Sequence, residues 1–99
     1  MSSTHYRETL RITADHPALP GHFPGRPVVP GVVLLDRIAA ALARWRGQRI
    51  AGMPQVKFLG PLLPGEDAEL VLHDAGNNVR FSITRDGAPV AAGMLEVAA

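Results

Sequence analysis

Hydrophobic and polar positions alternate near the start of the chain. Within residues 6–14, Leu10 and Ile12 fall on one side of an extended segment, and Arg11 and Thr13 fall on the other. Alternation with a period of two is typical of a strand that buries one face. We therefore predict a first strand over residues 6–14.

A continuous apolar segment follows a loop that is rich in proline and glycine. The loop spans residues 16–30, and from Gly31 to Arg46 the chain contains no further glycine or proline. Pro30 suits the start of a helix, where its missing N–H costs nothing. Basic residues followed by Gly47 suit the end of a helix. The pattern predicts a helix from Gly31 to Arg46 that is apolar almost all round and therefore buried.

Alternation returns after the helix and is divided by turn signals. Strands are predicted over residues 54–60, 69–73, 79–84 and 89–97. Turn residues separate them at 75–78 and 86–87, and small residues at 91–93 indicate that another group packs closely there. One helix and a meander of about four strands predict a single α+β domain over residues 1–99, with the sheet curled around the helix.

Composition adds an expectation about surfaces and compartment. Of the 99 residues, 46% are hydrophobic and 19% are charged, so we expect part of the surface to be hidden in an oligomer. The absence of cysteine excludes disulfides, thiolate catalysis and thiolate metal sites, and fits a cytoplasmic protein. Ten basic and nine acidic side chains are too balanced for a nucleic-acid-binding protein. No apolar run reaches the roughly 20 residues that are needed to span a bilayer, and the first residues lack the apolar core of a signal segment. We therefore expect a soluble protein.

Candidate chemistry gathers around the loop and the helix. His22 lies between Gly21 and Phe23, and Asp36 follows it by 14 residues (36 − 22) on the apolar helix. An imidazole has an ordinary pKa of about 6.5 and can act as a base near neutral pH. Desolvation among apolar neighbours is expected to raise the pKa of Asp36, so that this residue can act as an acid. A base and an acid in one apolar site are what β-elimination of water requires.

The start of the helix supplies a third component. Its first N–H groups, near Gly31 and Val32, point along the helix axis and carry a partial positive charge. They can bind an acyl carbonyl oxygen and stabilise the enolate that forms when the α-proton leaves. Each feature alone is more often structural, whereas the three together favour a catalytic site.

The same residues resemble a known family. Gly21-His-Phe-Pro-Gly25, Pro27-Val-Val-Pro-Gly31 and the acidic residue on the apolar helix are similar to the signature of the hotdog-fold 3-hydroxyacyl-[acyl-carrier-protein] dehydratases of fatty-acid synthesis. Residues 56–65, Val-Lys-Phe-Leu-Gly-Pro-Leu-Leu-Pro-Gly, resemble a second characteristic segment of that family. Many members carry Gln one turn after the acid, where this chain has Ala40. The short chain suggests a specialised member, of the kind associated with polyene or pigment lipids.

The resemblance implies a hotdog fold, in which a curved antiparallel sheet wraps around one long central helix and two chains share a continuous sheet. It implies that His22 is the catalytic base and that Asp36 of the other chain is the acid, so that a homodimer holds composite active sites. The implied substrate is a 3-hydroxyacyl group on the phosphopantetheine of acyl carrier protein, with no metal or redox cofactor. The substrate-binding residues would be Val28, Gly31, Val32 and Phe23.

Two other functions remain open. A hotdog acyl thioesterase would use Asp36 to activate water, but hydrolysis has no need of His22. A non-catalytic hotdog subunit would bind acyl chains or carrier protein, or would pair with a catalytic paralogue. Among the remaining residues, the default expectation for Arg37, Arg44, Arg46 and Arg49 is a solvated helix face, and the alternative is docking of an acidic carrier protein. We expect surface or loop positions for His5, His16 and His73. Phe23, Phe58 and Phe81 are expected in the core or in the walls of an acyl tunnel, with the core favoured.

Overall fold

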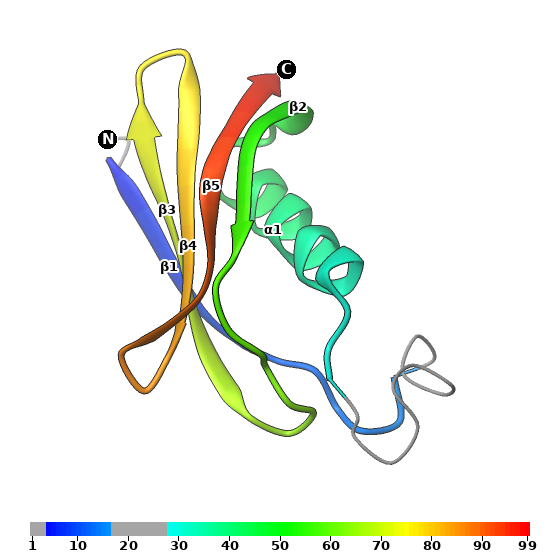
Figure 1. Ribbon diagram of the computed structural model, residues 1–99. Helices are drawn as coiled ribbons and strands as arrows, with labels where there is room; N and C mark the ends of the chain where they lie inside the picture. The colour runs from blue at the N-terminus through cyan, green and yellow to red at the C-terminus, as the bar shows by residue number, and fades with distance from the viewer. Residues whose placement is uncertain (1–3, 17–27) are drawn as a thin grey trace.

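The computed structural model describes residues 4–16 and 28–99. In chain order the elements are β1 (His5–Arg11), α1 (Gly31–Arg46), β2 (Arg49–Phe58), β3 (Asp67–Ala75), β4 (Asn78–Arg85) and β5 (Ala88–Ala98). The strands form one antiparallel sheet in the order β1-β3-β4-β5-β2. The sheet curves, and α1 lies along one of its faces (Figure 1). This arrangement confirms the predicted α+β class and the hotdog fold.

The ends of α1 confirm the predicted boundaries. Pro30 precedes the helix in an extended conformation, with φ −63° and ψ 146°. Gly47 follows it in the left-handed conformation, with φ 66°, and donates its backbone N–H to the carbonyl oxygen of Ala43 at 2.9 Å. Glycine adopts this conformation without a steric penalty, and Arg44 and Arg46 in the last turn suit the negative end of the helix dipole.

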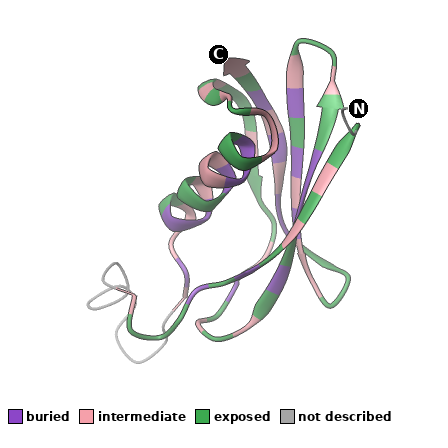
Figure 2. Cartoon of the chain, turned by 180° about the vertical axis from the view of Figure 1, so that it is seen from behind, coloured by how far each residue is buried: buried purple, intermediate pink, exposed green. Residues whose placement is uncertain are grey.

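The helix buries one face and exposes the other. Figure 2 shows its buried residues on the side that faces the sheet. Asp36 and Val32 are exposed on the opposite side, so the prediction that the helix is buried all round is wrong for the single chain. The physical reason is that one curved sheet covers only one side of a helix. The buried helix residues are Val33, Leu34, Ile38, Ala41 and Leu42.

The predicted meander of four strands is wrong in its connections. Strands β3, β4 and β5 form the meander, whereas β2 pairs with β5 at the far edge of the sheet. Strand β2 also begins at Arg49 and continues through Pro54, earlier than the predicted start at 54. An edge strand tolerates proline because no neighbour needs its N–H, and β2 carries two register shifts around Gly52. Strands β1 and β3 likewise differ from their predicted ends.

The core fills the space between the sheet and the helix. Phe81 is fully buried there, as predicted, and Leu10 and Ile12 are each 2% exposed, which confirms the face assigned to the first strand. Phe58, in contrast, is 55% exposed, so its predicted core position is wrong. This ring belongs to the last residue of the edge strand, where the sheet covers it on one side only.

Ion pairs connect the C-terminal end of α1 to the sheet, and an aromatic contact lies beside them. Nη2 of Arg44 donates hydrogen bonds to both carboxylate oxygens of Glu8 on β1, at 2.7 and 2.8 Å. Arg46 pairs with Asp74 at 3.1 Å and stacks on Trp45, with 3.9 Å between its Cζ and the ring centroid. Arg44 is exposed, as the solvated face predicts, whereas Arg46 is half-buried between Asp74 and Trp45.

Candidate active site

An apolar cavity lies at the N-terminal end of α1. It has a volume of about 280 Å³. One wall comes from the helix start and the residues that precede it, and the other comes from the end of β2 and the segment that follows. The lining residues are Val28, Val29, Pro30, Gly31, Leu34, Phe58, Gly60, Pro61 and Leu62.

Backbone hydrogen bonds hold the two walls in place. The N–H of Val29 donates to the carbonyl oxygen of Leu62 at 2.8 Å, and this bond joins the segment before the helix to the segment after β2. The N–H groups of Leu59 and Gly60 both donate to the carbonyl oxygen of Val90 on β5, at 2.8 and 3.3 Å. The cavity is therefore part of the rigid scaffold of the sheet.

The first two N–H groups of α1, those of Gly31 and Val32, lie at the end of the helix that borders the cavity. The N–H groups of Val33 and Leu34 already donate to the carbonyl oxygen of Pro30, at 3.0 and 3.4 Å. Within residues 4–16 and 28–99, no hydrogen bond engages the N–H of Gly31 or Val32. Pro30 has no side-chain cap to offer, and the first turn contains no acidic residue. Two N–H donors at a helix start that make no bond to another described residue can bind a carbonyl oxygen or a developing oxyanion.

The ring of Phe58 closes one side of this helix start. A Cβ built on Gly31 would lie 2.6 Å from Cζ of Phe58 and 2.9 Å from its Cε1. The absence of a side chain on Gly31 is therefore what allows the ring to approach the helix. A wall position was the less favoured of the two expectations for Phe58, and the close approach of its ring to Gly31 was not predicted from the sequence.

Asp36 does not share this cavity within one chain. It is exposed, and it follows Gly31 by five residues, which rotates it by about 140° and advances it on the order of 7 Å along the helix. The predicted desolvation of Asp36 is therefore absent from the single chain. Its neighbours on the same face are apolar: Val32 is 62% exposed, and Leu35, Ala39 and Ala40 are half-buried.

The predicted site residues thus divide into three groups. Val28 and Gly31 line the cavity, and Val32 lies beside it with its side chain exposed. Asp36 lies on another face of the helix. His22 and Phe23 fall outside the described residues, so their predicted roles stay predictions.

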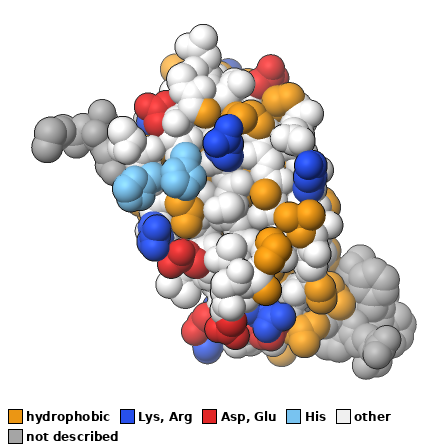
Figure 3. Space-filling model, turned by 60° about the vertical axis from the view of Figure 1, so that its left-hand side comes forward, with side chains coloured by type: hydrophobic (Ala, Val, Ile, Leu, Met, Phe, Trp, Pro, Cys, Tyr) orange, Lys and Arg blue, Asp and Glu red, His pale blue; other side chains and the backbone are white. Residues whose placement is uncertain are grey.

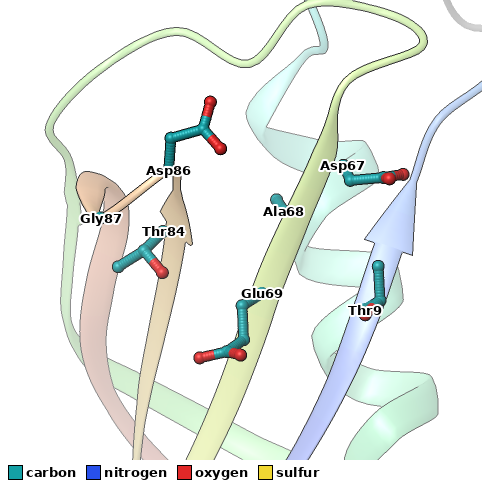
Figure 4. Close-up of a pocket in the computed structure, with 7 residues that line it drawn as sticks. All are labelled: Thr9, Asp67, Ala68, Glu69, Thr84, Asp86 and Gly87. Carbon is teal, nitrogen blue, oxygen red and sulfur yellow. The ribbon is translucent and has the colours of Figure 1, made fainter.

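A larger cavity, of about 440 Å³, lies on the face of the sheet that points away from α1 (Figure 4). Its acidic side chains already have partners: Asp67 pairs with Arg11 at 2.7 Å, and Glu69 pairs with Arg7 at 3.4 Å. It contains none of the predicted site residues, and Figure 3 shows side chains of both charge signs distributed over one side of the molecule. We therefore place the candidate site at the helix start.

No group of three His, Cys, Asp or Glu side chains that could hold a metal ion occurs in the part of the chain that the structure describes. His5 and His73 lie on neighbouring strands with their ring centroids 5.9 Å apart. No helix among the described residues is both long and apolar enough to cross a membrane.

Comparisons with known sequences point to one family. The sequence model of the ApeI-like family, described as ApeI dehydratase, matches residues 2–94. The 3-hydroxyacyl-[acyl-carrier-protein] dehydratase FabZ of Haemophilus influenzae is 35% identical over 69 residues, which cover 60% of this chain and 47% of that protein. FabZ of Myxococcus xanthus is 33% identical over 98 residues, covering 83% of this chain and 64% of that protein. The chain thus spans about half the length of the first of these relatives.

Comparisons with solved structures support the fold. A dehydratase heterocomplex, ApeI:P from Xenorhabdus doucetiae, superposes with a TM-score of 0.85 at 23% identity, over 97% of this chain and 88% of that one. An uncharacterized protein from Erwinia carotovora subsp. atroseptica gives a TM-score of 0.80 at 26% identity, over 95% and 82%. Since the family model matches nearly the whole sequence, the chain belongs to the ApeI-like dehydratase family.

Proposed function

We propose that the chain dehydrates 3-hydroxyacyl thioesters, carried on acyl carrier protein, to trans-2-enoyl thioesters in fatty-acid or polyene-type lipid biosynthesis. The observation that carries this proposal is the apolar cavity at the start of α1, beside the N–H groups of Gly31 and Val32, which bond to no residue that the structure describes. Family membership and the FabZ relatives support dehydration as the reaction class.

The reaction requires three groups in one place. The thioester carbonyl oxygen accepts a hydrogen bond from the N–H of Gly31, which stabilises negative charge on that oxygen. The imidazole of His22 removes the proton from the α-carbon, and the electron pair forms the new double bond as the C–O bond at carbon 3 breaks. The carboxyl group of Asp36 gives its proton to the departing hydroxyl, which leaves as water. This chemistry calls for no metal or redox cofactor, because the thioester already acidifies the α-proton.

The acid is supplied by a second copy of the chain in this proposal. Asp36 faces away from the cavity beside its own Gly31, so one chain alone does not bring the two together. Apolar residues surround Asp36 on the exposed face, and the 62% exposure of Val32 is a feature that a partner surface would cover. Pairing would also desolvate the carboxyl group, as the acid role requires.

A direct assay separates this function from its rivals. The purified protein is incubated with a 3-hydroxyacyl thioester and, separately, with a saturated acyl thioester. Dehydration yields an enoyl thioester and water, whereas a thioesterase releases free thiol. We expect enoyl product only, and we expect His22→Ala to lower its rate by about 10²–10⁴-fold with the fold intact. Free thiol from the saturated substrate, without enoyl product, would refute the proposal.

A non-catalytic role in a mixed complex is the second candidate. The exposed face around Asp36 could receive a different hotdog chain, and the ApeI:P neighbour from Xenorhabdus doucetiae is a heterocomplex. A stable homodimer with no turnover on either thioester would favour this candidate over the dehydratase.

A further inference from the structure

The position of Phe58 has a consequence for the choice of substrate. The Cα–Cβ bond of a helical residue tilts toward the N-terminus of the helix, and the first N–H groups point in that same direction. The tip of the Phe58 ring lies against the place where the Cβ of Gly31 would be: Cζ of Phe58 is 2.6 Å from that position. The ring therefore borders the space into which the N–H of Gly31 points.

A carbonyl oxygen bound by that N–H would lie about 2.9 Å from the nitrogen. Its carbon and the adjacent α-carbon would then be in van der Waals range of the ring. Strand β2 ends at Phe58, whose Cα partner on β5 is Ala91, and the next two N–H groups are bonded to Val90. The backbone that carries the ring is thus held by the sheet, and the ring itself lies against Gly31 at the helix start.

We propose that Phe58 is a specificity-determining residue that excludes acyl groups with a branch at the α-carbon. The inference rests on the proposed binding of the thioester carbonyl at Gly31. A methyl substituent on the α-carbon needs space next to the carbonyl, and in this proposal the ring, which lies against Gly31, limits that space. Truncation of the ring in Phe58→Ala opens the cavity wall at this point. Because Phe58 is 55% exposed, the substitution removes little core packing.

The kinetic test compares two substrates that differ by one methyl group. These are the N-acetylcysteamine thioesters of 3-hydroxybutyrate and 2-methyl-3-hydroxybutyrate, each of which retains an α-proton for elimination. We expect the ratio of kcat/KM for the branched over the unbranched substrate to rise at least about 10-fold in Phe58→Ala. Phe58→Tyr keeps the ring and should retain the wild-type ratio. Leu59→Ala is the matched control, since Leu59 is 52% exposed and lies outside the cavity lining.

A binding test decides the inference without relying on catalysis. The amide analogues of butyryl- and 2-methylbutyryl-N-acetylcysteamine, which lack the 3-hydroxyl group, cannot be dehydrated. NMR titration should show that Phe58→Ala gains affinity for the branched amide relative to the unbranched one, again by about 10-fold. If the wild-type protein dehydrates neither thioester but Phe58→Ala shows this gain in affinity, the proposed reaction fails and the role of Phe58 stands. Unchanged ratios in a folded Phe58→Ala variant would overturn the inference.

Discussion

Phe81 on β4 and Gly93 on β5 face each other directly across the sheet, and the Phe81 ring fills the place of a glycine side chain. A Cβ built on Gly93 would lie 2.7 Å from Cε1 of Phe81, and it would also collide with the backbone carbonyl oxygen of Gln55 on β2. Phe81 is fully buried, so its ring has nowhere to move. The small residues at positions 91–93 indicated such close packing from the sequence alone.

Gly93→Ala is therefore expected to destabilise the protein strongly. Overpacking against a buried ring and a backbone atom should cost about 3 kcal/mol, which corresponds to a fall of roughly 12–24 °C in Tm for a domain of this size. Gly31→Ala is the matched control, because the atom that its Cβ would meet is the far end of the 55% exposed Phe58 side chain, which can shift slightly toward solvent, and not a backbone atom. Thermal unfolding of both variants checks this, and an equal loss in the two would contradict it.

The ion pair between Arg44 and Glu8 is expected to hold the end of α1 to β1. Hydrogen bonds to Glu8 and then Tyr6, with the charge of Glu8, raise the pKa of Arg44 above its ordinary value, so the guanidinium stays charged. Both side chains reach solvent, so Glu8→Gln should lower Tm by only a few degrees. A double-mutant cycle with Arg44→Met should show coupling that shrinks at high salt. Additive effects would contradict the pairing.

Asp15 provides a local test of the turn that follows β1. A hydrogen bond from the Thr13 hydroxyl is the main cause that lowers the pKa of Asp15 from its ordinary value of 3.8. A lowered pKa stabilises the fold above the unfolded-state value, and this contribution is lost as the pH falls through the folded-state value. Thr13→Val should raise the pKa of Asp15 toward 3.8, measured by NMR titration of the carboxyl carbon. No upward change would refute the assigned cause.

The ends of the helix and the turns were predictable because short-range chemistry decides them. Pro30 and Gly47 bracket α1 as expected, and Asp86 and Gly87 form the β4–β5 turn with φ of 50° and 80°. Positive φ at both turn positions is what the Asp-Gly sequence favours. These features depend on residues that are neighbours in the chain.

The placement of β2 was not predictable in the same way. Its partner, β5, is distant in sequence, and alternation within a strand says which face is buried but not which strand lies alongside. Pro54 also suggested a later start than Arg49, although an edge strand accommodates it. The exposure of Phe58 follows from this edge position.

The candidate site was predictable in part. Gly31 and Val28 lie at the cavity, as expected from the loop that leads into the helix. The sequence predicted a buried Asp36, but Asp36 is exposed in the single chain, because the apolar residues beside it on the helix also face outward. An apolar pattern in the sequence looks the same whether the residues are buried in the core of their own chain or against a second chain.

Val32 offers a test of the proposed pairing. It is 62% exposed and lies one helical turn before Asp36, on the face that the partner would cover. Val32→Asp places a charge in that interface and should weaken self-association by at least about 10-fold, measured by analytical ultracentrifugation. Asn77→Asp adds the same charge in the exposed β3–β4 turn and should leave association unchanged. Equal association of both variants would argue against this face.

In the proposed dimer, each active site takes its base, His22, from one chain and its acid, Asp36, from the other. Mixed dimers of a His22→Ala chain and an Asp36→Asn chain, purified through two different tags, test it directly. Composite sites leave one of the two sites with both His22 and Asp36, so the mixed dimer should regain about half of the wild-type dehydration rate while each parent homodimer stays inactive. A mixed dimer as inactive as its parents would contradict the account.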